Sequence, residues 1–336
     1  MGNQRAARRR AKILIGFFSA ALMAIAFFHF SLSRPVGTGP AGPGLSRDHF
    51  KKPWSSRPVL FLGMGDSVTA GFGARKGLSY FDLLATNPPS EFPDLGEISL
   101  ADLFPNLRST NMALSGSTSL QHLKLQLSKL PRQSEETLGV IVLTTGGNDI
   151  IHNYGRTAPH EGAMYGATFE NAKPWIANFE LRLDQILTNF QQLFPGGCHV
   201  FLANIYDPTD GVGDAEKAGL PAWKDGRQIL NAYNKIINKS AAKHSFVHLV
   251  NIHDEFLGHG IHCTQFWRTA YRNKDPHYWY HENLEDPNER GYDALRRLFL
   301  IEMAKVFQPT QVKERLRIRE TLHAPLSSLA PLCPNR

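Results

Sequence analysis

Three polar segments that could carry out nucleophilic chemistry each follow a short apolar run. The first, Gly65-Asp66-Ser67, places a serine hydroxyl among small residues, where a tight turn can project it. Gly116 follows the second run, and a glycine there lets a backbone N–H approach a substrate. Asn148 follows the third run with an amide that can donate to a developing oxyanion. Taken singly, each segment equally suits a turn or a helix cap, so their combination is what indicates chemistry.

The elements that must position these residues are five short apolar runs with helical patterns between them. The runs cover residues 59–63, 109–113, 140–144, 199–205 and 246–252, and the helical patterns cover 120–130, 175–194, 229–237 and 294–307. This alternation predicts a parallel sheet with helices on both faces and right-handed crossovers. Ligands of such sheets bind beyond the carboxyl ends of the strands, so Ser67, Gly116 and Asn148 are expected on one rim.

The combination resembles the GDSL family of hydrolases, also called the SGNH family. Gly65-Asp66-Ser67 is similar to its first block, Gly116 to its second, and residues 146–149 (GGND) to its G-x-N-D block. The resemblance covers roughly residues 58–307. It implies a flavodoxin-like α/β/α sandwich of three layers with a five-stranded parallel sheet and no cofactor. It also implies Ser67 as nucleophile, and an oxyanion hole made by the N–H groups of Ser67 and Gly116 and the Asn148 amide.

The block that supplies the family's base, D-x-x-H-P-N-x-x-G, is altered in this chain. The matching stretch is 283–291, in which the proline (Pro287), the asparagine (Asn288) and the glycine (Gly291) are kept. Asp286 stands where the histidine is expected, and Asn283 where the aspartate is expected. Serine is a weak nucleophile without a base, and an aspartate with its ordinary pKa of about 3.9 must be desolvated to serve near neutrality. Asp286 could instead orient a histidine that arrives from a loop.

The connection before the last helical pattern supplies histidines that could replace the missing base. It is about 40 residues long, far longer than usual connections, and could fold back across the rim. His277 is our first choice because Asp275 lies two residues before it, and His281 and then His262 follow. We therefore expect His277→Ala to lower kcat on an aryl acetate by at least about 10³-fold.

Cysteine and histidine spacing allows two further interpretations of the same loop. His259 and His262, with Cys263 adjacent, could bind zinc, but no second pair lies at a matching spacing, so no metal site is predicted. The chain has three cysteines, an odd number that leaves at least one unpaired. Cys263 is expected to form half of a disulfide that pins the loop.

The amino-terminal residues predict membrane targeting. Residues 1–12 contain five basic residues and no acidic one, and residues 13–31 (ILIGFFSAALMAIAFFHFS) are apolar over 19 residues. That length suits a helix spanning a bilayer, with the basic end in the cytoplasm. An uncleaved signal anchor over 13–33 is favoured over a cleaved signal peptide, whose apolar core is usually 7–15 residues long. Residues 34–57 are then a flexible linker, 58–307 the hydrolase domain and 308–336 a peripheral tail.

The formal net charge of +7 first suggests a nucleic acid or anionic partner. Five of the positive charges lie in residues 1–12, which leaves +2 for the other 324 residues. The domain is therefore nearly neutral, and no nucleic-acid partner is expected.

These features together predict an ester hydrolase outside the cytoplasm that acts on an acylated glycan, a lipid or a small ester. Two alternatives remain open. The same nucleophile could transfer an acyl group to an envelope glycan, or the fold could be a binding protein without activity, as Asp286 at the histidine position suggests.

Overall fold

The computed structural model describes residues 2–88, 91–96 and 98–308, so all but the first residue of the predicted tail lies outside the described residues. Five parallel strands form one sheet in the order β2-β1-β3-β4-β5, which confirms the predicted fold class. The strands are β1 (Val59–Met64), β2 (Leu107–Asn111), β3 (Leu138–Leu143), β4 (Cys198–Ala203) and β5 (Val247–Val250).

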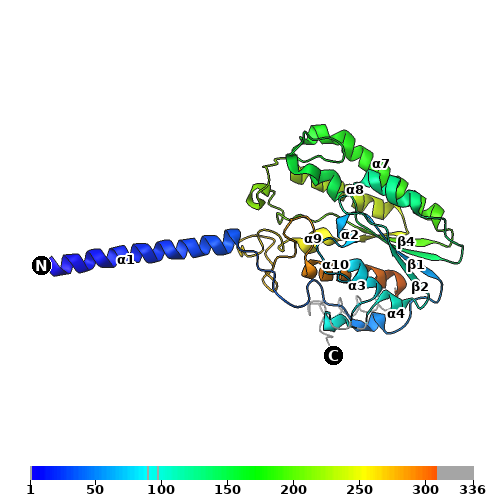
Figure 1. The fold of residues 1–336 in the computed structure, drawn as a ribbon, viewed down its shortest axis with the longest axis horizontal. Helices are drawn as coiled ribbons and strands as arrows, with labels where there is room; N and C mark the ends of the chain where they lie inside the picture. Colours follow the sequence, from blue (N-terminus) through cyan, green and yellow to red (C-terminus); the bar gives the residue numbers. More distant parts are fainter. Residues whose placement is uncertain (1, 89–90, 97, 309–336) are drawn as a thin grey trace, which may run out of the picture.

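The sheet is covered by helices on both faces (Figure 1). Every residue of β1 and β3 is buried, as expected for strands with an unbroken apolar sequence in a parallel sheet. Because side chains alternate along a strand, Val59 and Phe61 enter one core and Leu60 and Leu62 the other. Helices α3 (Tyr80–Ala85), α4 (Leu100–Leu103) and α10 (Glu289–Phe307) cover the first core, and α7 (Phe169–Leu193) and α8 (Gly226–Lys243) the second.

Short helices follow the carboxyl ends of three strands, where the predicted site lies. They are α2 (Ser67–Ala70), α6 (Gly147–Ile151) and α9 (Ile252–Phe256), and single 3₁₀ turns cover Arg47–Phe50, Pro93–Leu95, His152–Gly155 and Ala215–Ala218. The predicted helix over 120–130 is wrong as a single α-helix. It consists of α5 (Ser119–Gln121), a π-helical turn (His122–Gln126) and a 3₁₀ turn (Leu127–Lys129). The wider turn accompanies buried polar side chains of His122 and Gln126, and such turns often occur at functional sites.

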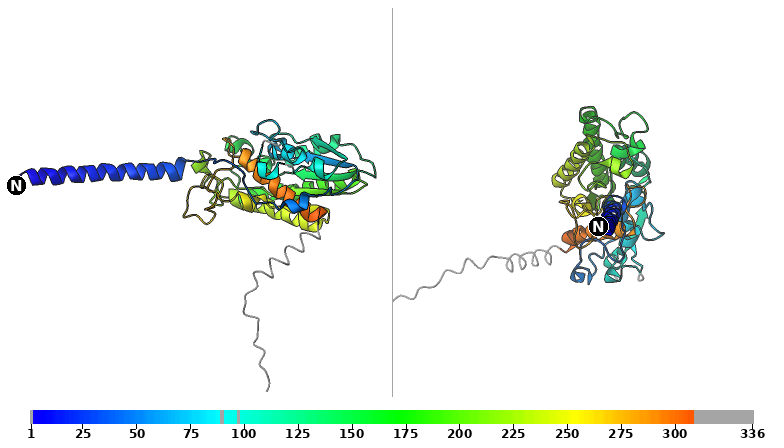
Figure 2. Two further views of the ribbon diagram at one scale, coloured as in Figure 1. Left: turned by 90° about the horizontal axis from the view of Figure 1, so that it is seen from below. Right: turned by 90° about the vertical axis from the view of Figure 1, so that its left-hand side faces the viewer.

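The amino-terminal helix α1 (Gly2–Phe27) and the π-helical turn Phe28–Leu32 project from the domain as one rod (Figures 1 and 2). By length and composition, the stretch Lys12–Leu32 is apolar enough to cross a membrane, and it is not buried in the domain. Residues 35–41, predicted to be flexible, instead hydrogen-bond to the domain, and Ala41 is buried. Cys263 is a buried free thiol, as is Cys198, so the predicted disulfide at Cys263 is wrong for the structure described.

Candidate active site

The turn after β1 presents Ser67 at the carboxyl edge of the sheet. Gly65 has a φ of +132°, and a Cβ atom there would lie 2.1 Å from the carbonyl oxygen of Thr144, so only glycine fits. Asp66 caps helix α2 by accepting a hydrogen bond from the backbone N–H of Val68 at 3.2 Å. Ser67 is the first residue of that helix and remains half-buried. The cap interpretation therefore holds for Asp66 and leaves Ser67 available.

Two buried side chains tie this turn to the segment containing Gly116. The Gln126 amide donates to the carbonyl oxygen of Gly65 at 2.7 Å and accepts from its N–H at 2.9 Å. The Ser117 hydroxyl lies 2.9 Å from the same carbonyl oxygen and 3.0 Å from a ring nitrogen of His122. The other ring nitrogen of His122 lies 3.0 Å from the Thr145 hydroxyl after β3. Burial lowers the pKa of His122 to about 3, so this ring is neutral.

The two other predicted oxyanion donors lie together. The buried Asn148 amide donates to the carbonyl oxygen of Ser117 at 3.1 Å, which holds it beside the Gly116 turn. An amide nitrogen carries two hydrogens, so one remains for a substrate. Gly116 has a φ of +77°, and the nearest atom to a Cβ there would be a ring carbon of His152 at 4.0 Å. The space beside Gly116 is therefore open.

Asp149, the residue after Asn148, fixes helix α6 to the neighbouring helices. The Asp149 carboxylate accepts from the backbone N–H of Ser119 at 2.8 Å and from its hydroxyl at 2.6 Å, and pairs with Arg182 at 3.3 Å. Burial raises the pKa of Asp149, and the Ser119 hydrogen bonds and Arg182 oppose that rise. This bonding joins α5, α6 and α7 and fixes the start of α6, where Asn148 lies.

Asp286 is brought to Ser67 by the loop before α10. Its carboxyl group is almost fully buried, and burial raises its pKa, while hydrogen bonding by Ser67 and by Asn283 and the charge of His281 lower it. The Asn283 amide donates to Oδ2 of Asp286 at 2.7 Å. Oδ1 has no protein partner with full hydrogen-bond geometry among the described residues. Ser67 lies close enough to lower the pKa of Asp286, and Oδ1 is the carboxyl oxygen that has no other partner in the described part of the chain.

Two further carboxyl groups surround Asp286. Burial raises the pKa of Asp66 to about 6, the Thr144 hydroxyl opposes this, and the charge of Asp286 adds to it. Burial also raises the pKa of Glu285, and the charge of Asp286 again adds to the rise. A negative charge on one carboxyl group disfavours ionisation of its neighbours. The three groups therefore hold a proton more readily than isolated carboxyl groups do.

A largely apolar pocket opens beside Ser67 at the carboxyl edge of the sheet. Asp66, Ser67, Asn148 and Glu285 form part of its polar wall. Its apolar wall includes side chains from α6, from the loop after β4 and from α8, namely Ile151, Ile205, Leu220, Trp223 and Leu230. Ser67 and Asn148 therefore line the same largely apolar cavity.

Comparison with known protein families identifies the family of this chain. The model of the GDSL-like lipase/acylhydrolase family matches residues 64–294, which include Ser67, Gly116, Asn148 and Asp286. The chain belongs to that family. A search of curated proteins gives no match.

Solved structures similar to this family member include three hydrolases. An extracellular lipase from Streptomyces rimosus is 20% identical, with 73% of this chain and 99% of the other covered and a TM-score of 0.48. A phospholipase A1 from Streptomyces albidoflavus is 18% identical (74% and 100% covered, TM-score 0.44). A variant of an acetyl xylan esterase from Geobacillus stearothermophilus is 17% identical (74% and 96% covered, TM-score 0.47).

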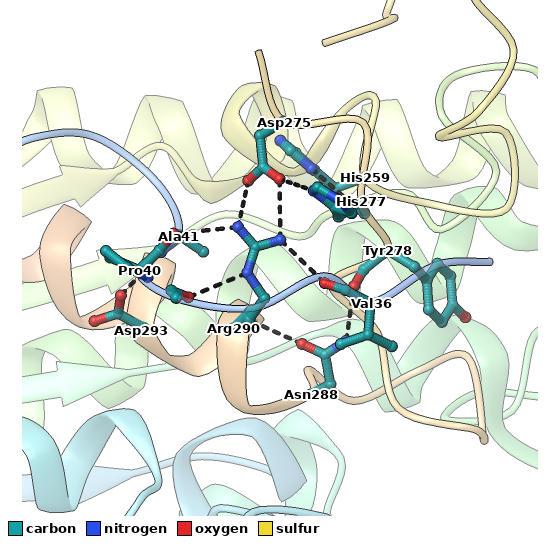
Figure 3. Close-up of polar contacts among 12 residues, drawn as sticks. Val36, Pro40, Ala41, His259, Asp275, His277, Tyr278, Asn288, Arg290 and Asp293 are labelled. Atoms are coloured by element: carbon teal, nitrogen blue, oxygen red, sulfur yellow. Dashed lines mark hydrogen bonds and ion pairs between the residues drawn. The ribbon is translucent and has the colours of Figure 1, made fainter. Parts of the chain in front are cut away.

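The structure joins the predicted Asp275 and His277 to each other but not to Ser67. The Nδ1 atom of His277 lies 2.5 Å from Oδ1 of Asp275. Arg290 donates one hydrogen bond of 2.9 Å to each oxygen of the same carboxylate. Figure 3 shows this group around Arg290 beside residues 36–41. Among the described residues, neither Asp275 nor His277 lines the pocket beside Ser67. His277 as the base of this GDSL-like protein stays a prediction. Asp286 does not line the pocket either, but it lies beside Ser67.

The other candidate histidines lie in different surroundings, and of these His281 lies next to Asp286, whose pKa its charge lowers. His281 donates its backbone N–H to the carbonyl oxygen of Asp286 at 2.7 Å, and its ring packs edge-on against Phe72. His262 is buried against Asp214, with 2.8 Å between ring nitrogen and carboxylate. His259 stacks on Trp279. In the part of the chain that the structure describes, no three His, Cys, Asp or Glu side chains are placed to hold a metal ion.

Sequence reasoning missed the residues that support the site. Gln126 and His122 lie in the segment predicted to be helical. Both polar side chains are buried in the structure, and the sequence gives no separate sign of this. Asn283 was noticed only as a departure from the family's block, and its hydrogen bond to Asp286 depends on the loop's conformation.

Proposed function

We propose that this GDSL-like protein hydrolyses carboxylic esters, with Ser67 as the nucleophile, and acts outside the cytoplasm while α1 holds it in a membrane. The observation that carries the proposal is that Ser67 shares one apolar pocket with Asn148 and lies beside the buried carboxyl group of Asp286, whose Oδ1 has no hydrogen-bond partner among the described residues. A nucleophile and an oxyanion donor thereby line one pocket, and a proton acceptor lies beside the nucleophile.

In the proposed first step, the Ser67 oxygen attacks the ester carbonyl carbon and its proton passes to the Asp286 carboxylate. Burial supports this role because it raises the pKa of Asp286 and makes the carboxylate a stronger base than an exposed aspartate. The carbonyl oxygen becomes an oxyanion that accepts hydrogen bonds from the N–H groups of Ser67 and Gly116 and from the Asn148 amide. Each such donor is worth about 3–4 kcal/mol of barrier.

In the proposed second step, the carbon–oxygen bond to the alcohol breaks and protonated Asp286 returns its proton to the departing oxygen. An acyl group then remains on Ser67. Water attacks this acyl-enzyme and loses its proton to Asp286, and the acid leaves as Ser67 recovers the proton. No redox change or external reactant besides water is needed.

The pocket supports an ester with an apolar acyl or alcohol group. Its walls are mostly aliphatic and aromatic side chains, among them Ile205, Leu230 and Trp223, and burying such surface contributes about 25 cal/mol per Å². An acylated glycan, a lipid and a small ester all remain within this class. Placement outside the cytoplasm rests on the apolar stretch Lys12–Leu32 and the basic residues before it.

A fluorophosphonate probe tests the proposal directly, because it phosphonylates an activated serine. We expect labelling of the purified full chain that is lost in Ser67→Ala, together with turnover of p-nitrophenyl esters that is lost in the same variant. Ser128→Ala is the matched control, since Ser128 is exposed and bonds only to a backbone carbonyl oxygen in the described structure.

Other outcomes would separate the alternatives. Folded protein that takes up no probe and turns over no ester would contradict the proposal and support a binding protein. An acyl-enzyme that persists in water but discharges when a glycan is added would support acyl transfer.

A further inference from the structure

We infer that the loop carrying Phe266 and Trp267 inserts into the outer interface of the same bilayer that α1 crosses, so that the domain is docked on the membrane in one orientation. This inference rests on the proposed role of α1 as a membrane anchor. It adds a second membrane contact made by the domain itself.

The two aromatic side chains are adjacent and exposed. Phe266 is 63% exposed and Trp267 is 55% exposed, although the residues just before them, Thr264 and Gln265, are buried. Aromatic side chains of this size are normally covered in a soluble domain, and an exposed apolar pair indicates an interaction surface. Tryptophan in particular is enriched where a bilayer meets water.

This loop is fastened to the end of the apolar helix. The ring of Phe30 lies 5.6 Å from that of Phe266 and 4.9 Å from that of Trp267, measured between centroids. Thr264 donates through its hydroxyl to the carbonyl oxygen of His29 at 3.1 Å, and Gln265 through its amide to that of Phe30 at 2.8 Å. These bonds satisfy carbonyl groups that a helix end leaves without partners.

The position of Phe30 along the helix sets the depth of the loop. The apolar stretch Lys12–Leu32 has 21 residues, and at about 1.5 Å per residue it spans about 30 Å, the thickness of a bilayer's hydrocarbon core. Phe30 comes two residues before the end of this stretch. The rings that touch it therefore lie where hydrocarbon gives way to headgroups.

The segment after the helix leaves little slack between membrane and domain. Arg290 donates to the carbonyl oxygens of Val36, Gly39 and Pro40 at 3.1–3.2 Å (Figure 3). The backbone N–H of Tyr278 donates to the carbonyl oxygen of Pro35 at 2.8 Å. A Cβ at Gly37, whose φ is +73°, would lie 2.7 Å from the ring of His277. The chain is thus held flat against the domain as soon as it leaves the helix.

The orientation that follows turns the carboxyl edge of the sheet toward the bilayer. Helices α2 and α9, which follow β1 and β5, lie on the side of the domain from which α1 projects (Figure 1). Docking through Phe266 and Trp267 would hold that side close to the lipid surface.

Quenching of tryptophan fluorescence by lipid tests the inference on the full chain. The protein is reconstituted into phosphatidylcholine vesicles, and flotation after an alkaline carbonate wash first establishes insertion. Emission is then compared in vesicles with and without lipid brominated near the headgroup end of its acyl chains. Trp267→Phe keeps an aromatic ring in the loop and removes only its indole emission. Trp175→Phe on α7 is the matched control, because Trp175 is half-buried and packs against the core.

We expect Trp267→Phe to lose at least half of the lipid-dependent quenching and Trp175→Phe to lose none, while both keep full turnover of a soluble aryl ester. Chain that floats with vesicles but is quenched equally with and without Trp267 would overturn the docking and leave the anchor standing. Chain that is washed off the vesicles would overturn the anchor and the docking together.

Discussion

Asn283 donates a hydrogen bond of 2.7 Å from its amide to the Asp286 carboxylate, and these are the two positions at which this chain departs from its family's aspartate–histidine block. In the family's pattern a carboxylate orients an imidazole. Here the earlier residue of the pair, Asn283, donates the hydrogen bond and the later residue, Asp286, accepts it, which is the reverse of the family's arrangement. The spacing of three residues is the same. Oδ2 is occupied by Asn283 and Oδ1 is left for the Ser67 hydroxyl. The chain therefore holds a buried carboxyl group beside Ser67 at the position where the family's histidine is expected.

Replacing the carboxylate should abolish most turnover. We expect Asp286→Asn to lower kcat on an aryl ester by about 10²–10⁴-fold, the range for loss of a general base, because the amide keeps the shape but cannot accept the serine proton. Steady-state kinetics of the full chain measure this. Asp184→Asn, at an exposed ion pair on α7, should stay within about twofold of wild type.

The same assay distinguishes the histidines. His277→Ala should change kcat by less than about threefold, because its ring is bound to Asp275 away from the pocket lining. A loss of about 10³-fold in His277→Ala with Asp286→Asn near normal would instead support His277 as the base.

The Asn148 amide should matter for the rate rather than for binding. We expect Asn148→Ala to lower kcat by about 10²–10³-fold with little change in KM, because the oxyanion forms only in the transition state. Asn189→Ala on the outer surface of α7 is the matched control, since its amide bonds only to a carbonyl oxygen one turn earlier in the described structure. A raised KM with unchanged kcat would show that Asn148 binds the ground state instead.

Buried His122 should make the domain less stable in acid. Its pKa is about 3 in the folded protein against about 6.5 when unfolded, so the unfolded chain holds one more proton between these values. The free energy of unfolding should therefore fall as pH falls from about 6 to 4, by up to about 1.4 kcal/mol per pH unit from this group.

Urea unfolding at several pH values measures this slope. His122→Gln should reduce the slope whatever it does to stability at pH 7, and His160→Gln, at an exposed histidine, should leave the slope unchanged. An unchanged slope in His122→Gln would mean that other groups cause the acid sensitivity.

Arg290 should secure the segment that joins helix and domain. It is buried, pairs with Asp275 and donates to three carbonyl oxygens of residues 36–40. We expect Arg290→Met to lower the free energy of unfolding by about 3 kcal/mol, since it removes the guanidinium partner of a half-buried carboxylate, and to expose residues 35–41 to proteolysis. Lys239→Met, at an exposed pair with Glu180, should cost under about 1 kcal/mol and leave the segment protected.

The pocket should set the preferred length of the substrate. Leu220 is half-buried in its apolar wall, so Leu220→Trp should fill space that a longer chain uses. We expect kcat/KM for an octanoyl ester to fall about tenfold relative to that for an acetyl ester. Equal losses on both esters would indicate that the long chain lies elsewhere.

The sequence by itself determined the parallel sheet and which polar residues follow its strands. Continuous apolar runs such as VLFLGM in β1 can only be buried strands or buried helices, and their length and spacing favour strands. Since parallel strands end at one edge, Ser67 and Asn148, each following a strand, were brought to one pocket as local sequence predicts.

Only the tertiary structure decided which group meets Ser67. The connection between β5 and α10 is long enough to present any of several side chains, and the conformational preferences of its residues do not choose among them. Its path is fixed by long-range contacts, such as the donation from Tyr278 to Pro35 and the pairing of Asp275 with Arg290. Those contacts turn His277 toward the amino-terminal segment and leave Asp286 beside Ser67, because packing and charge pairing between distant residues outweigh local sequence pattern.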